Sequence, residues 1–199
     1  LITNMDSPLG SAVGNSLEVI ESVEILKGKT SGDLWTVCRE LSCRMLMLAG
    51  IGDKDECGRL VDEAVESGEA LKRFEMMVKL QGGDVSYIED TSKFRKASFS
   101  REVYAPADGY ITHMDSEKIG LITVLLGAGR EKKDDDINHA AGIIIAAKTG
   151  DFVKRGELLA TLLADDESLL DGAESRYLSA VSIGDKKPAE QPMILDYID

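Results

Sequence analysis

Apolar side chains recur every three or four positions through residues 15–80, which is the spacing of amphipathic helices. This pattern predicts a strand end at 1–3, a turn at 7–10, and helices at 15–27, 33–50, 55–67 and 69–80. The expected buried stripe of the second helix consists of Leu34, Val37, Leu41, Met45 and Leu48. The expected inward side chains of the fourth helix are Leu71, Phe74, Met77 and Val78.

The pattern changes after a polar stretch that follows Gly82-Gly83. Short apolar runs separated by Gly, Pro and Asp are typical of a β-rich module. Strands are expected at 103–105, 109–112, 121–126, 152–153 and 158–163. Helical stretches are expected at 116–119, 137–147 and 169–181.

Composition narrows the classes of function. The chain has 199 residues, 43% of them hydrophobic, and a formal net charge of −13. Acidic charge repels phosphate backbones and anionic lipid heads, so neither nucleic acid nor a membrane is expected as a partner. No apolar run approaches the length of a bilayer-spanning helix and no secretion signal is visible, so a cytoplasmic location is expected. The three cysteines, Cys38, Cys43 and Cys57, lack metal-ligand spacing and are expected to be reduced thiols.

Few residues suggest chemistry by themselves. His113 and His139 are the two histidines, and neither lies in a nucleophile motif. The three carboxylates at 134–136 favour a solvated loop over a metal site, because consecutive side chains point in different directions. The run 127–130, Gly-Ala-Gly-Arg, would allow an anion to approach the backbone, but it lacks the third glycine of a dinucleotide motif. A simple turn from residue 127 into a loop at 130–138 is an equal alternative.

Two phrases, 105–111 and 148–159, resemble the half-repeats of the biotinyl and lipoyl carrier fold. Together with the helical half, they predict an α/β (α+β) fold: helical layers of an incomplete α/β domain, followed by a β-rich C-terminal module that resembles a barrel-sandwich hybrid. A carrier presents its modified lysine on a hairpin between the two halves. The lysines in that interval, Lys118, Lys132 and Lys133, lie in unrelated settings, so attachment of a prosthetic group is disfavoured.

The most specific phrase is residues 1–22, a strand followed by a Pro-Leu-Gly turn and a Gly-Asn-x-x-Glu-Val-x-Glu helix. It closely resembles the pyrimidine and thymidine nucleoside phosphorylases, and the resemblance continues through 125–130, 141–143 and 150–158. It implies the following division of the chain: the C-terminal part of the phosphorylase α/β domain at 1–83, a connecting segment at 84–101, the pyrimidine nucleoside phosphorylase C-terminal domain at 102–181, and a tail at 182–199.

The resemblance also implies an activity. Enzymes of this family use inorganic phosphate to cleave a pyrimidine nucleoside into the free base and a (deoxy)ribose 1-phosphate, and they are homodimers. Their phosphate loop and base-binding residues precede the phrase with which this chain begins. The resemblance therefore implies no catalytic and no substrate-binding residue here, and a chain that is inactive alone. The alternatives are a non-catalytic biotinyl- or lipoyl-like binding module and an inactive truncated product.

One functional element of the family falls within the chain. The resemblance implies a potassium ion held by Leu9, Ala12 and Glu21. Potassium is a hard cation that prefers oxygen ligands, and a turn before a helix leaves backbone carbonyls such as those of Leu9 and Ala12 able to face it. Residue type alone would favour a solvated helix-surface carboxylate at Glu21.

Overall fold

The computed structural model describes residues 1–130 and 132–198, and it divides the chain into two compact units. The first unit contains residues 1–3, 19–94 and 192–199, and the second contains 4–18 and 95–191. Glu131, within the loop predicted at 130–138, and Asp199, at the end of the predicted tail, lie outside the described residues.

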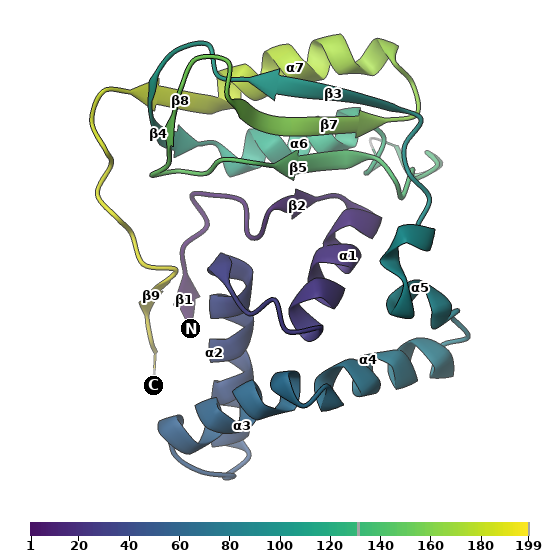
Figure 1. Cartoon of the computed structure of the whole chain (residues 1–199), viewed down its shortest axis with the longest axis vertical. Coiled ribbons are helices and arrows are strands. Elements are labelled where there is room, and N and C mark those ends of the chain that lie inside the picture. The colour runs from purple at the N-terminus through teal and green to yellow at the C-terminus, as the bar shows by residue number, and fades with distance from the viewer. Residues whose placement is uncertain (131, 199) are drawn as a thin grey trace. The chain divides into compact units, whose positions relative to one another are not determined.

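Helices dominate the first unit (Figure 1). Helix α1 starts in the second unit and continues into the first, and the four helices predicted from the apolar spacing are confirmed. The elements are β1 (Ile2–Thr3), α1 (Asn15–Leu26), α2 (Gly32–Leu48), α3 (Lys54–Glu66), α4 (Glu69–Leu80), α5 (Ser86–Glu89), the 3₁₀ turn η1 (Thr91–Lys93) and β9 (Ile194–Asp196).

Helices α2 and α3 pack against each other. The Asp53 side chain caps α3 by accepting a hydrogen bond from the Glu56 backbone N–H at 2.9 Å. Arg39 on α2 donates to both carboxylate oxygens of Asp62 on α3 at 2.6 Å, a bidentate pair that fixes the register of the two helices.

The closing strand β9 pairs antiparallel with β1, so both ends of the described chain lie side by side (Figure 1). Beyond β9, the ring of Tyr197 lies 4.2 Å from the guanidinium carbon of Arg44 on α2. Arg44 also donates to Glu40 at 2.9 Å. Burial raises the pKa of Glu40, but the Arg44 hydrogen bond and the charge of Lys54 outweigh burial and lower it overall. Glu40 is therefore a buried carboxylate held in its ionised form.

The buried stripe predicted for α2 is wrong at three of its positions. Val37 is buried, but Leu41, Met45 and Leu48 are 44%, 63% and 89% exposed. The buried residues of α2 are instead Val37, Glu40 and Cys43.

Three of the four side chains predicted to face inward from α4, Leu71, Phe74 and Val78, are half-buried. The fourth, Met77, is 45% exposed, and no residue of this helix is fully buried.

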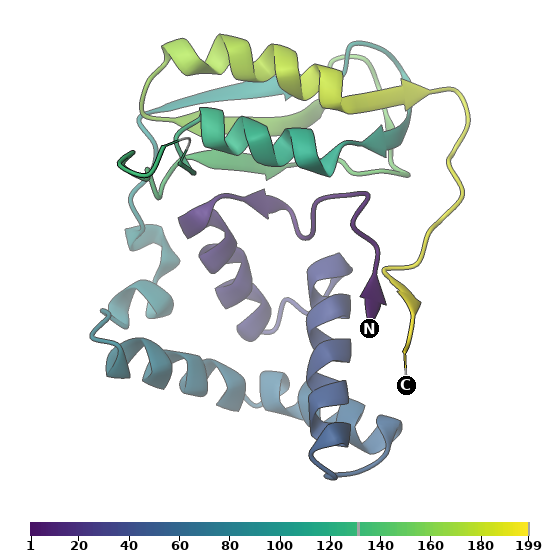
Figure 2. The ribbon, with the colours of Figure 1, turned by 180° about the vertical axis from the view of Figure 1, so that it is seen from behind.

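Two antiparallel sheets and two helices form the second unit. Helices α6 and α7 cover the same face of the four-stranded sheet (Figure 2), and the apolar cluster of the unit lies beneath them. The predicted mixed helix-and-sheet fold class is confirmed. The four-stranded sheet has the order β2 (Ala12–Val13), β5 (Gly142–Ile145), β7 (Leu158–Ala164) and β3 (Phe99–Tyr104). The three-stranded sheet has the order β6 (Phe152–Val153), β4 (Gly109–Met114) and β8 (Val181–Gly184). The helices are α6 (Ser116–Leu125) and α7 (Ser168–Ala180).

Two element predictions in this unit are wrong. The run 121–126, expected as a strand, lies mostly within α6, because the Asp115 side chain caps a helix there by accepting from the Lys118 N–H at 3.0 Å. The run 137–147, expected as a helix, contains β5 instead. Short apolar runs fit either structure, so the cap and the sheet partner decide between them.

Every helix among the described residues is too short or too polar to cross a lipid bilayer.

A polar network at Asp165 joins three segments of the second unit. The Asp165 carboxylate, just after β7, accepts hydrogen bonds from Arg95 at 2.5 Å, from the Ser98 backbone N–H at 2.8 Å and from the Asn138 side chain at 3.0 Å. The Arg95 hydrogen bond is the main reason why the pKa of Asp165 falls to about 2. Residues 95–98, which lead into β3, are thereby tied to the end of β7.

Because its pKa is lowered in the folded protein, Asp165 stabilises the fold fully above about pH 4 and loses this contribution as the pH falls through about 2. We expect Asp165→Asn to lower the free energy of unfolding at pH 6, and the difference from the unchanged chain to shrink between pH 4 and pH 2. Urea unfolding at several pH values measures this. Arg95→Met should show the same convergence, and a difference that stays constant to pH 2 would contradict the assignment.

Candidate functional site

The segment at residues 4–18, which contains two of the predicted potassium ligands, is joined to the second unit by β2. In the antiparallel ladder, Ala12 faces Ile144 and Val13 faces Ile143. The Ile145 N–H extends the ladder by donating to the Ser11 carbonyl at 2.7 Å. The backbone of this segment is therefore held at the edge of a buried sheet.

Two glycines allow the backbone at the end of β2 to lie close to the backbone at the start of β5. A Cβ atom on Gly142 would lie 2.3 Å from the Val13 carbonyl oxygen and 3.1 Å from the Gly14 Cα atom. A Cβ atom on Gly14 would lie 2.5 Å from the Ala141 carbonyl oxygen. Both residues also have positive φ, 149° and 146°, a region that favours glycine. Gly14, from the phrase at 1–22, and Gly142, from the phrase at 141–143, thus form one backbone contact.

A lysine from a distant part of the chain holds the turn before β2. The Lys148 ammonium group donates to the Gly10 carbonyl at 2.7 Å, across 138 positions of sequence. Gly10 has a φ of 72°, which turns the backbone between Leu9 and Ala12. The turn therefore already presents one carbonyl oxygen to a cation.

The structure places the three predicted potassium ligands as follows. Leu9 is exposed on the turn and Ala12 is buried in β2, both within the second unit, while Glu21 is partly exposed on α1 in the first unit. Leu9 and Ala12 lie in the same segment, one on the turn and one at the start of β2, and the three-ligand set stays a prediction.

Their chemistry fits a hard monovalent cation, since carbonyl oxygens are ligands that such a cation prefers and one carbonyl of the same turn, that of Gly10, already binds an ammonium group. Among residues 1–130 and 132–198, no group of three or more His, Cys, Asp and Glu side chains is placed to hold a metal ion. A site at this turn would therefore be built largely from backbone oxygens.

The start of α1 is tied to the turn that follows α6. The Asn15 side chain donates to the Ala128 carbonyl at 2.8 Å, and the Ser16 N–H donates to the His139 carbonyl at 3.0 Å. The Gly14 N–H donates to the Glu18 carboxylate at 2.9 Å, which satisfies a donor before the first helical turn. Local sequence patterns cannot predict the contacts of Asn15 and Lys148, because each contact joins residues more than 100 positions apart.

Gly127 ends helix α6 in a Schellman motif. The Gly127 N–H donates to the Val124 carbonyl and the Ala128 N–H donates to the Thr123 carbonyl, both at 2.9 Å. A Cβ atom on Gly129 would approach the Val124 side chain to 2.7 Å. Helix termination and packing therefore account for the Gly-Ala-Gly run, and its first two N–H groups are not available to an anion.

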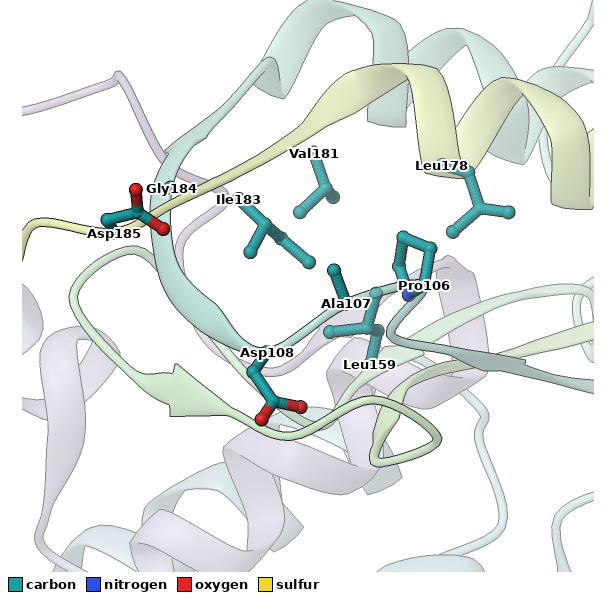
Figure 3. A pocket seen from close by; sticks show the side chains of 9 residues that line it. All are labelled: Pro106, Ala107, Asp108, Leu159, Leu178, Val181, Ile183, Gly184 and Asp185. Atoms are coloured by element: carbon teal, nitrogen blue, oxygen red, sulfur yellow. The ribbon is translucent and has the colours of Figure 1, made fainter.

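A hollow of about 320 Å³ lies in the second unit between the turn at 106–108, the end of α7 and strand β8 (Figure 3). Its walls are apolar, and the carboxylates of Asp108 and Asp185 lie at its margin. Carboxylates at the mouth repel phosphate, so this hollow does not suit an anionic substrate. Its apolar lining residues are Pro106, Ala107, Leu159, Leu178, Val181 and Ile183.

Within the part of the chain that the structure describes, the remaining candidate residues do not come together in one site. His113 is exposed on β4, and Asp135 accepts from the Lys132 N–H within a loop turn. Lys118 lies in the first turn of α6 with its ammonium group 2.8 Å from Asp115, so it is not on a hairpin tip.

The family model and the individual proteins that match this chain carry the same description. Residues 110–184 match the family model described as the pyrimidine nucleoside phosphorylase C-terminal domain. The pyrimidine-nucleoside phosphorylase of Bacillus subtilis (strain 168) is 39% identical over 170 residues, which cover 85% of this chain and 39% of that protein. Those of Staphylococcus aureus strains RF122/ET3-1 and USA300 are 37% identical over 186 residues, which cover 93% of this chain and 43% of each protein. The chain spans about two fifths of the length of these relatives.

The glycine contact yields a stability prediction. We expect Gly142→Ala to lower the free energy of unfolding by at least about 2 kcal/mol, because the methyl group meets backbone atoms and the positive φ disfavours alanine. Urea unfolding followed by circular dichroism measures this. Gly120→Ala is the matched control, since its added methyl meets nothing within 4 Å in α6 and alanine favours the helix. Equal stability of the two variants would show that Gly14 and Gly142 are not in close contact.

Proposed function

We propose that this chain, which belongs to the pyrimidine-nucleoside phosphorylase family, takes part in the phosphorolysis of pyrimidine nucleosides to free base and (deoxy)ribose 1-phosphate. The observation that supports this most is identity of 37–39% over 85–93% of the chain to proteins of that name. Because the chain spans about two fifths of their length, we assign the activity to this chain together with the polypeptide that corresponds to the rest of such an enzyme.

The reaction needs phosphate and the nucleoside held in line, with positive charge near the phosphate and hydrogen-bond donors near the departing base. The hollow in the second unit offers apolar walls and carboxylates, which are unsuited to both tasks. The contribution of this chain is therefore a scaffold: the segment at 4–18, fixed by β2 and Lys148, presents a rigid turn to the reaction centre.

We further propose that this turn holds the potassium ion through the carbonyl oxygens of Leu9 and Ala12, with the Glu21 carboxylate as a third ligand. A bound potassium ion would add positive charge that favours the binding of phosphate. Lys148 is then a positioning residue, because its ammonium group fixes the Gly10 carbonyl between the two ligand carbonyls. Phosphate and a pyrimidine nucleoside are the proposed substrates, and the complete enzyme is proposed to be a homodimer.

The activity is tested by measuring phosphate-dependent release of thymine from thymidine and of uracil from uridine. We expect no release by the 199-residue chain alone, and release when it is produced together with the part of the Bacillus subtilis enzyme that lies outside the 170 aligned residues. Omission of phosphate is the control. Turnover by the chain alone would contradict the scaffold role, and absence of turnover in the combination would contradict the proposed activity.

The role of Lys148 is tested in the active combination. We expect Lys148→Met to raise the potassium concentration needed for half-maximal rate by about tenfold, the equivalent of one charge-assisted hydrogen bond. Lys154→Met is the matched control, because Lys154 is an exposed lysine six residues further along the chain. An unchanged potassium response in Lys148→Met would contradict the positioning role, and a rate independent of potassium would contradict the ion site.

A further inference from the structure

The hollow in the second unit combines apolar walls with an acidic mouth (Figure 3). Its volume of about 320 Å³ lies at the lower end of the range of small-ligand pockets. Leu159, which lines it, is buried, whereas Leu178, Val181 and Ile183 pack against the apolar cluster and stay half-exposed. An apolar group that entered the hollow would therefore remove these side chains from water, which is favourable.

The walls of the hollow are fixed by the fold. A Cβ atom on Gly109, just after the turn at 106–108, would lie 2.9 Å from the Gly184 carbonyl oxygen, so this turn lies directly against β8. Gly109 has a φ of 153°, a conformation that favours glycine. The start of the turn is also held, because the Gly156 N–H donates to the Ala105 carbonyl at 2.8 Å. A ligand would therefore meet a pocket that is already formed, and binding would order little of the chain.

Two carboxylates give the mouth its charge. The Asp108 Oδ1 atom accepts a hydrogen bond from the Arg155 backbone N–H at 2.7 Å, which orients the carboxylate without neutralising it. Within residues 1–130 and 132–198, neither Asp108 nor Asp185 forms an ion pair. Lys186 and Lys187 follow Asp185 in the sequence but are not among the residues that line the hollow. The mouth therefore attracts cations.

The lining distinguishes between kinds of cation. A bare metal ion needs oxygen ligands on several sides, which apolar walls do not supply. A quaternary ammonium ion is held best by aromatic rings, and the described residues around the hollow include no aromatic side chain. A primary ammonium group donates hydrogen bonds to carboxylates, and an alkyl chain attached to it matches the apolar walls. The chemistry of the lining therefore suits a primary alkylammonium ion.

We propose that this hollow is a binding site for a small primary alkylammonium ion. The alkyl chain lies against Leu178, Val181 and Ile183. The ammonium group donates to the two carboxylates at the mouth, Asp108 and Asp185. This site is separate from the proposed phosphorolysis, in which the hollow has no part.

The first test titrates hexylammonium chloride into the nitrogen-15-labelled 199-residue chain and follows the backbone amide signals by NMR. We expect saturable shifts at lining residues such as Ala107 and Ile183, with a Kd on the order of 1 mM. Butylammonium is two methylene groups shorter and should bind about tenfold more weakly, because it removes less apolar surface from water. Hexanoate has the opposite charge and should give no saturable shift at these residues.

The second test changes the mouth and the interior separately. We expect Asp108→Asn/Asp185→Asn to weaken hexylammonium binding by about tenfold, the combined effect of two exposed charge contacts. The matched control, Asp134→Asn/Asp136→Asn, removes the same charge from an exposed loop outside the hollow and should bind as the unchanged chain does. Ala107→Phe should abolish the saturable shifts, because its ring occupies the hollow while both mouth carboxylates remain.

The amide spectrum of each variant reports directly whether it is folded. Absence of saturable shifts at the lining residues of the unchanged chain would overturn the proposal. Equal weakening by the mouth variant and its control would assign binding to the overall negative charge of the chain, and binding of hexanoate as tight as that of hexylammonium would exclude a role for the carboxylates. Either result would also overturn it. None of these measurements depends on turnover, so the alkylammonium site and the proposed phosphorolysis stand or fall separately.

Discussion

The direct contact between the backbones at Gly14 and Gly142 sets the position of the segment at 4–18. Because neither residue has a side chain, β2 lies close enough to β5 for a regular ladder. The neighbouring contacts follow from that register: the Ile145 N–H meets the Ser11 carbonyl, and the Lys148 ammonium group meets the Gly10 carbonyl. The turn at 7–10 thus acquires a defined backbone shape, which is what a site made of carbonyl oxygens requires.

The two units differ in how they are stabilised. The second has two sheets, two covering helices and a contiguous apolar cluster, and its polar groups at Asp165 are matched to donors. The first unit is held by individual polar contacts: the bidentate Arg39–Asp62 ion pair, the Asp53 helix cap and the Tyr197–Arg44 cation–π contact. Such contacts fix geometry but bury little apolar area, so they orient helices without supplying the main stabilising term.

Sequence predicted elements better than it predicted burial. Helix α4 begins and ends where its apolar spacing and flanking glycines indicate, whereas the run 121–126 was assigned to a strand because a short apolar run has no distinctive period. The spacing of Leu41, Met45 and Leu48 identified an apolar face, but a pattern cannot say what covers that face. Leu9, Ala12 and Glu21 came from family resemblance, since carbonyl ligands leave no trace in residue type. The contacts of Lys148 and Asn15 depend on tertiary structure, which no local pattern reports.

The pairing of β1 with β9 has a consequence for the order of folding. Ile2 faces Asp196, so this pairing closes a loop of nearly the whole chain, and the entropy of closing so long a loop is recovered only after the intervening residues have become compact. During synthesis, residues 95–191 emerge before the strand that completes the first unit. The second unit can therefore form its core before β9 pairs with β1, so that residues 1–3 are among the last of this chain to reach their final partner.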